Sequence, residues 1–182
     1  MTDASSNMLG KWAESAVYWA KHQGLIRAMF APVTDALMVE TGISRDDLVL
    51  DVAAGPGEPS MTIADRVGPS GRVCCTDGVL PMVLASRTEA GRRKLRNIDF
   101  CQCRAEALPF RDAAFDALVC RFGVMFCEDP TAAAREMLRV TKPTRWISLA
   151  AWSFDEVNPF HSIVTHVLNQ YDPVPATDFN AV

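Results

Sequence analysis

Residues 48–57 read LVLDVAAGPG, and this stretch decides the fold. A short apolar strand ends at Asp51 and runs directly into a turn that contains Gly55 and Gly57. A helix pattern follows at once over residues 59–67. Glycines let a backbone come close to a ligand, and the N-terminus of a helix offers free N–H groups. This layout is typical of a nucleotide-cofactor pocket at the end of a parallel strand.

The composition is that of an ordinary globular protein. The chain has 182 residues, enough for one domain with a real core, and 49% of them are hydrophobic and 22% charged. A net charge of -4 gives no electrostatic support for nucleic-acid binding. No apolar run approaches the ~20 residues of a membrane helix, and the N-terminal residues lack the apolar core of a signal peptide. We therefore expect a cytoplasmic protein without a membrane span and without a nucleic-acid partner.

The six cysteines do not suggest a metal site. None of them forms a C-x-x-C pair, and no histidine follows at zinc-finger spacing. Most of them fall inside predicted strands, where cysteine behaves as a small buried hydrophobe. We expect reduced, structural thiols and no bound metal.

Strand and helix patterns alternate five times, which predicts an α/β fold with a doubly wound parallel sheet. Two helices, over residues 8–23 and 25–40, precede the first strand, and Gly42 ends the second of them. The pattern then predicts strands over 72–77, 98–103, 117–120 and 146–152, and helices from Pro81, over 131–140 and over 159–171.

Two of these strands differ in their patterning. Residues 98–103 alternate between polar and apolar, which predicts a strand at the edge of the sheet. Residues 117–120 are continuously apolar, except where cysteine closes the run, and this predicts a central strand. Asp129 and Pro130 form a suitable N-cap and first-turn pair for the helix that follows.

Asp77 is the second landmark, because it ends the strand after the glycine turn and follows the glycines by about 20 residues. An acid there can accept hydrogen bonds from two ribose hydroxyls, although it can also merely cap the next helix. Together the turn and the acid favour a nucleoside site. Gly55, Gly57 and Asp77 also fit a dinucleotide fingerprint, so a nicotinamide-dependent oxidoreductase is an alternative. Against it, Ser60 stands at the third glycine position and the sequence has no Tyr-x-x-x-Lys pair.

Four stretches resemble the class I S-adenosylmethionine-dependent methyltransferases, especially the branch of the ubiquinone/menaquinone C-methyltransferases (methyltransferase type 11). They are VLDVAAGPG, GPSGRVCCTDGVLPM, AEALPFRDAAFDALVCRFGVMF and REMLRVTKP, in the order and spacing of the family. The resemblance covers roughly residues 12–160. It implies an enzyme that moves a methyl group from S-adenosyl-L-methionine to a small, partly apolar acceptor by in-line displacement.

The resemblance also implies a Rossmann-like sheet of strand order 3-2-1-4-5 with helices on both faces. The family continues into strands six and seven, and the sequence stops before them. We expect an N-terminal helical cap over residues 1–43 and a C-terminally shortened S-adenosylmethionine-binding domain over 44–182, forming one structural unit. The exposed edge of strand five favours pairing of two copies as a homodimer.

The resemblance assigns cofactor-binding roles to particular residues. From the methionine end through the ribose to the adenine and the methyl-transfer centre, they are Asp51, Gly55, Pro56, Gly57, Asp77, Gly78, Met82, Arg104, Ala105 and Arg121. Tyr18 and Trp19 of the first helix would close over the cofactor, although helix packing explains these two aromatic residues equally well.

Five residues depart from the family pattern. Ala53 stands at the first glycine, and Thr144 with Arg145 replaces a double glycine. Arg104 stands where an acid usually accepts a hydrogen bond from the adenine amino group, which an arginine cannot do. Arg121 replaces a small polar residue, and its charge would either repel the sulfonium or bind an anionic substrate. These two arginines and the short C-terminus motivate a third interpretation, a non-catalytic cofactor-binding fragment or pseudoenzyme.

No sequence motif assigns a catalytic residue. Methyl transfer depends mainly on positioning, with an optional base. The weak candidates for such a base are His161, His166 and Asp155, and an ordinary surface position is the competing interpretation for both histidines.

Overall fold

The computed structural model describes residues 3–154 and 157–171. The chain forms two compact units, Met1–Ala150 and Ala151–Val182. The first unit contains α1 (Asp3–Lys21), α2 (Gln23–Met29), α3 (Ala31–Thr41), β1 (Leu48–Asp51), α4 (Ser60–Val67), β2 (Arg72–Asp77), α5 (Leu80–Arg92), β3 (Ile98–Gln102), β4 (Ala117–Arg121), the 3₁₀ turn η1 (Val124–Phe126), α6 (Pro130–Val140) and β5 (Ile147–Ala150). The second unit contains α7 (Pro159–Tyr171), the helix expected over 159–171.

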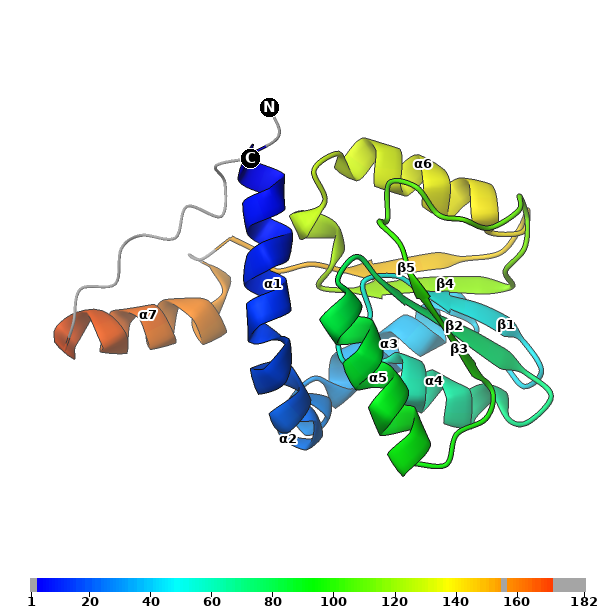
Figure 1. Cartoon of the computed structure of the whole chain (residues 1–182), viewed down its shortest axis with the longest axis horizontal. Helices are drawn as coiled ribbons and strands as arrows, with labels where there is room; N and C mark the ends of the chain where they lie inside the picture. Colours follow the sequence, from blue (N-terminus) through cyan, green and yellow to red (C-terminus); the bar gives the residue numbers. More distant parts are fainter. Residues whose placement is uncertain (1–2, 155–156, 172–182) are drawn as a thin grey trace. The chain divides into compact units, whose positions relative to one another are not determined.

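The sheet has five parallel strands in the order β3-β2-β1-β4-β5 (Figure 1). Val49 of β1 is in register with Val73 of β2 on one side and with Ala117 of β4 on the other. This confirms the predicted strand order, with β3 at an edge and β4 inside the sheet. Because strand order reverses between β1 and β4, the carboxyl ends of these strands border the crevice in which ligands of such sheets bind.

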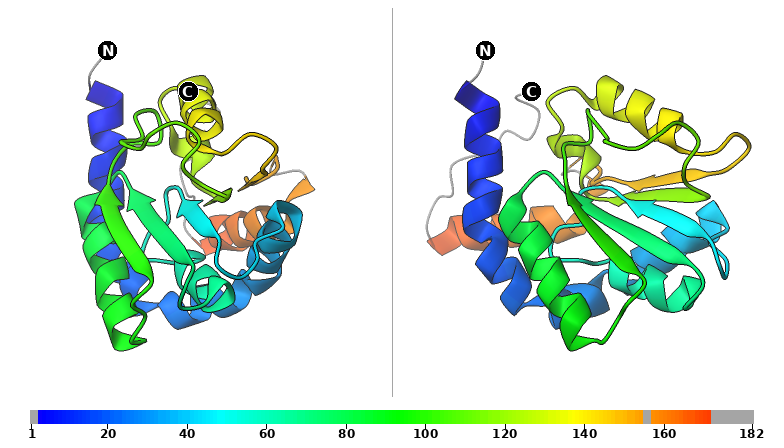
Figure 2. Two further views of the ribbon diagram at one scale, coloured as in Figure 1. Left: turned by 90° about the vertical axis from the view of Figure 1, so that its right-hand side faces the viewer. Right: turned by 45° about the vertical axis from the view of Figure 1, so that its right-hand side comes forward.

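Helices cover both faces of the sheet, as predicted (Figure 2). On one face α3, α4 and α5 pack on Val49, Val73 and Val119. On the other face α6 and the segment 103–115 pack on Leu50 and Leu118. Successive residues of β1 and β4 therefore enter opposite cores, which explains why these strands are apolar without alternation.

The helix expected over residues 25–40 is wrong as one element, because the chain bends at Phe30 between α2 and α3. Pro32 is the cause: a proline has no N–H to donate, and its ring clashes with the carbonyl of the residue four positions earlier. Pro32 instead occupies the first turn of α3, where these defects cost nothing. Gly42 ends α3 in the left-handed conformation (φ +65°), as predicted.

The remaining elements agree with the sequence pattern to within a few residues. The Asp129 side chain caps α6 by accepting a hydrogen bond of 2.9 Å from the Ala132 N–H. Strand β5 is shorter than the predicted 146–152, and η1 was not predicted. No helix among the described residues is long and apolar enough to cross a membrane.

The six cysteines are free thiols, distributed over the core and its margin. Cys74, Cys75 and Cys120 are buried in strands, and burial raises the pKa of Cys75 and Cys120 to about 12. A thiol with so high a pKa carries almost no thiolate at neutral pH and is a poor nucleophile. These cysteines therefore act as core residues.

Candidate functional site

Three neighbouring strands end in charged side chains at one edge of the sheet. Asp51 ends β1, Asp77 ends β2 and Arg121 ends β4. The carboxyl ends of parallel strands meet at the same edge, so these residues border a common region. The glycine-rich loop, residues 52–59, leaves β1 at this edge and leads into α4.

The Asp77 carboxylate holds the glycine-rich loop against the end of β2. Its Oδ2 accepts a hydrogen bond of 2.9 Å from the Gly55 N–H, and its Oδ1 accepts one of 2.9 Å from the Val79 N–H. Burial raises the pKa of Asp77, and these two hydrogen bonds oppose that rise. Each carboxylate oxygen has a second lone pair, so Asp77 can hold the loop, accept the N–H of Val79 just before α5 and still accept a hydroxyl from a ligand.

Asp51 is fully buried and carries an acceptor without a partner. Its Oδ2 accepts a hydrogen bond of 2.5 Å from the Ser60 hydroxyl. Among the described residues, no group donates a hydrogen bond to its Oδ1. Burial raises the pKa of Asp51 to about 7, against the hydrogen bond from Ser60 and the positive charge of Arg121. A buried, unpaired acceptor at the end of β1 fits a ligand that brings a cationic donor.

Two backbone carbonyls of the loop accept hydrogen bonds from other elements. The Gln23 side chain, at the start of α2, donates to the Pro56 carbonyl. The Arg121 guanidinium donates to the Glu58 carbonyl at 2.9 Å and to the Thr34 hydroxyl of α3 at 2.8 Å. Gln23 of α2 thus reaches the loop directly, and Thr34 of α3 reaches it through Arg121.

The side chain of Glu58 attaches the loop to two further helices. Its Oε1 accepts from Arg93, just after α5, at 2.8 Å, and its Oε2 accepts from the Thr62 hydroxyl of α4 at 2.7 Å. Only 7% of the Glu58 side chain is exposed, and Arg93 also pairs with Asp65 at 2.6 Å. The loop is therefore fixed from β2, β4, α2, α4 and the end of α5 before any ligand arrives.

Close packing at this edge requires small residues. Gly57 has φ +113°, and a Cβ on it would lie 2.5 Å from Met61 Cε and 2.9 Å from Ser86 Cβ. A Cβ on Gly123, after β4, would lie 2.4 Å from Ala53 Cβ. Ala53 itself has φ +55°, a left-handed conformation that favours glycine and explains why the family places a glycine there.

Helix α1 lies over the expected adenosine side of the site. Met82 is buried in a cluster with Ala16 of α1, and Trp19 packs against this cluster. A Cβ on Gly78 would be 3.4 Å from Leu9 Cδ2 of α1. The Trp12 ring packs on Phe126 of η1 with 4.9 Å between centroids. Gly78 therefore faces Leu9 of α1, and Met82 and Trp19 belong to one cluster on the same helix.

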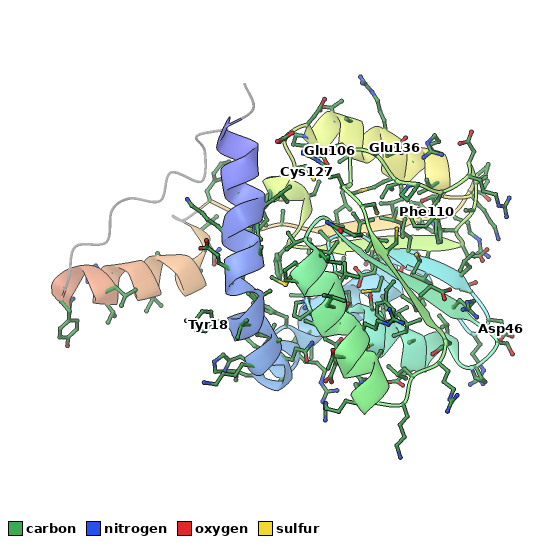
Figure 3. The ribbon with its side chains drawn as sticks, viewed as in Figure 1. Tyr18, Asp46, Glu106, Phe110, Cys127 and Glu136 are labelled. Carbon is green, nitrogen blue, oxygen red and sulfur yellow. The ribbon has the colours of Figure 1, made fainter. Side chains whose placement is uncertain are left out.

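Tyr18 and Arg104 have other surroundings. Tyr18 is 70% exposed and lies on the side of α1 that is turned away from the sheet (Figure 3). Arg104 pairs with Glu128 at 2.6 Å and with Glu106 at 3.2 Å, while its neighbour Ala105 is buried. Burial acts to raise the pKa of Glu106, but hydrogen bonds from Arg104 and from backbone N–H groups lower it overall. The charge of Arg104 is therefore compensated within the protein.

The three candidate bases belong to the second unit. His166 of α7 is exposed, and its Nε2 lies 3.2 Å from Gln170 Nε2. Asp155 and the His161 side chain lie outside the described part of the chain. In the range 3–154, 157–171, no cluster of three or more His, Cys, Asp or Glu side chains is arranged to hold a metal ion.

Sequence reasoning missed four residues that fix the loop, namely Glu58 in the loop itself and Gln23, Thr34 and Arg93 outside it. Glu58 adjoins Gly57 and could have been noticed from that position alone. The other three lie far from the loop in sequence and carry no motif, so only the tertiary structure identifies them.

The chain is similar to known methyltransferases over most of the first unit. Residues 50–149 match the family described as a methyltransferase domain. The ubiquinone/menaquinone biosynthesis C-methyltransferase of Xylella fastidiosa is 36% identical over 132 residues, which are 66% of this chain and 50% of that protein. The corresponding enzyme of an Enterobacter species is 33% identical over 148 residues, 76% of this chain and 57% of that protein. The chain spans about half the length of these curated relatives.

Solved structures share the fold. An S-adenosylmethionine-dependent methyltransferase from Aquifex aeolicus has a TM-score of 0.63 at 22% identity, covering 75% of this chain and 77% of that one. The cyclase SpnF has a TM-score of 0.61 at 28% identity, covering 65% of this chain and 43% of that one. The first likeness supports the Rossmann-like fold. The likeness to a cyclase shows that proteins with this fold catalyse different reactions, so the fold alone does not identify the reaction.

The packing around Gly57 generates a stability prediction. Gly57→Ala should lower the free energy of unfolding by about 2 kcal/mol or more, since the new methyl group meets Met61 and Ser86 and the backbone is left-handed. Gly55→Ala is the matched control: it is also left-handed, but its Cβ would have no neighbour within 4 Å, so a loss of about 1 kcal/mol is expected. Urea denaturation measures both, and equal losses would contradict the packing argument.

The raised pKa of Asp51 leads to a prediction about how stability depends on pH. A carboxyl whose pKa is raised from 3.8 unfolded to about 7 folded binds more protons when folded, so its contribution to stability is lost as the pH rises from about 4 to about 7. Relative to Asp51→Asn, the wild type should lose on the order of a few kcal/mol of unfolding free energy across this window. Parallel stability curves for the two proteins between these pH values would show that Asp51 is not protonated in the fold.

Proposed function

This chain belongs to the methyltransferase-domain family, whose cofactor is S-adenosyl-L-methionine, and we propose that it transfers the methyl group of that cofactor to a small, partly apolar acceptor. When bound, S-adenosyl-L-methionine supplies a methyl group activated on a sulfonium sulfur. The observation that carries the proposal is the pair of carboxylates at adjacent strand ends, Asp51 and Asp77, joined by the glycine-rich loop.

The two carboxylates at this edge are acceptors that fit the two polar ends of the cofactor. Asp77 has lone pairs left for the ribose hydroxyls after it has accepted the Gly55 and Val79 N–H groups. The unpaired, buried Oδ1 of Asp51 suits the ammonium of the methionine part, because a cation nearby favours the ionised carboxylate. The tight packing at Gly57 gives the backbone of the loop a fixed surface for the ligand.

Aromatic side chains near the end of β4 support an apolar acceptor. Trp12 packs on Phe126 at 4.9 Å, and Phe30 packs on Phe122 at 5.1 Å, so rings from the N-terminal helices meet rings from the segment after β4. The names of the relatives, enzymes of ubiquinone and menaquinone biosynthesis, point in the same direction. In this proposal the protein contributes mainly by holding the acceptor in line with the methyl group and by excluding water.

The experiment that tests the function starts with binding. Calorimetric titration of the purified chain with S-adenosylhomocysteine should show one saturable site, and NADH should not compete for it. Transfer of a labelled methyl group from S-adenosyl-L-methionine to a panel of small hydroquinones and phenols then tests the reaction. A folded chain that binds no S-adenosylhomocysteine would overturn the cofactor assignment, and binding without transfer to any acceptor would favour the non-catalytic interpretation.

Asp77→Ala should weaken S-adenosylhomocysteine at least tenfold, since it removes the acceptor for the ribose and releases the loop. It should also lower the free energy of unfolding by about 2 kcal/mol, because the Gly55 and Val79 N–H groups lose a charged acceptor. Asp99→Ala is the matched control, an acid of the same sheet whose pair with Arg72 is exposed. Equal affinities of the Asp77 variant and the wild type would remove Asp77 from the site.

A further inference from the structure

Arg121 ends β4, where the family resemblance places the methyl-transfer centre, yet its guanidinium is already engaged by the protein. Nη1 donates to the Thr34 hydroxyl at 2.8 Å and Nη2 donates to the Glu58 carbonyl at 2.9 Å. The guanidinium also lies 5.6 Å from the centroid of the Phe30 ring, within the range of a cation–π contact. Its partners come from α3, from the glycine-rich loop and from the bend between α2 and α3.

The surroundings of these bonds make them difficult to exchange. Thr34 and Glu58 are both buried, with 3% and 8% of their surface exposed. If Arg121 turned toward a ligand, the Glu58 carbonyl and the Thr34 hydroxyl would lose the donor that the structure gives them. An unsatisfied buried polar group costs more than a typical hydrogen bond contributes. A direct contact with the cofactor would therefore compete against an established set of internal bonds.

We propose that Arg121 is a positioning residue, which holds the glycine-rich loop and α3 in one arrangement and strengthens cofactor binding through the loop without touching the cofactor. The inference rests on the proposed function, because it concerns the same site. It assigns to the N-terminal helices a role in cofactor affinity: α3 acts through Thr34 and Arg121, and α2 acts through the bond from Gln23 to the Pro56 carbonyl.

A truncated ligand separates the positioning role from direct contact. The methionine carboxylate is the group of the cofactor that an arginine would bind directly. Affinities are measured for S-adenosylhomocysteine and for its decarboxylated analogue, which keeps the adenosine and the amine. Arg121→Met should weaken both ligands by the same factor, on the order of tenfold to a hundredfold, because the loop shifts for both. Arg121→Lys, which keeps the charge but not the two-pronged geometry, should recover part of the loss.

Thr34→Val provides the second variant, because it removes the α3 end of the clamp and leaves Arg121 in place. Positioning predicts that this variant also weakens both ligands, by about threefold to tenfold, and that Arg121→Met costs less in its background than in the wild type. Direct contact predicts the opposite sign, since freeing Arg121 from Thr34 would make it more available to the carboxylate. All titrations are made at temperatures where thermal denaturation shows each variant to be folded.

The outcomes are distinct. Losses shared by the two ligands and coupled between Arg121 and Thr34 support the inference. A loss confined to the ligand that carries the carboxylate, or tighter binding by Thr34→Val, overturns the inference alone and leaves the proposed function intact. A folded wild type that binds neither ligand overturns both.

Discussion

The hydrogen bond from the Gly55 N–H to the Asp77 carboxylate is the contact on which the functional edge depends. It joins the turn after β1 to the end of β2, across two strands that are already in register. The same carboxylate accepts the N–H of Val79, the residue before α5, so one side chain joins the loop, the end of β2 and the turn that leads into α5. Because its acceptors are not exhausted, the group that organises the edge can also be the group that binds there.

The loop is preorganised at a cost that the rest of the fold compensates. Ala53 and Phe122 both adopt left-handed backbone conformations, and such strain is found where surrounding contacts determine the geometry. Asp51 and Arg121 are ionisable groups largely removed from water. Burial raises the pKa of Asp51 and lowers the pKa of Arg121, which favours the neutral form of each. Hydrogen bonds from Ser60 and the charge of Arg121 oppose the rise for Asp51, and the charges of Asp51 and Glu58 oppose the fall for Arg121. A site that is built this way needs little rearrangement to receive a ligand, which favours both affinity and positioning.

The N-terminal helices belong to this arrangement and do not only cover it. Trp12 meets η1, Gln23 binds the loop and Thr34 binds Arg121, so α1, α2 and α3 each contact a different part of the edge. Arg104, at the expected adenine side, is a similar case: its pairs with Glu106 and Glu128 neutralise a cation that is unusual for the family. A departure that looks disabling in the sequence is compensated by side chains from other segments.

The family resemblance implied the strand order. The sequence by itself determined the alternation of strands and helices, the glycine turn and the positions of Asp51 and Asp77 at strand ends, because these follow from local patterning and from short-range spacing. It also determined the cap of α6 at Asp129, whose partner is three residues away. The single helix predicted over residues 25–40 is wrong, because Pro32 starts a new helix after Phe30. Only the tertiary structure decided what Arg121 and Arg104 bind and which face of α1 meets the sheet. The partners of these residues lie in distant segments of the chain. The position of a charged or aromatic residue in the sequence does not reveal which distant side chains it will contact in the folded protein.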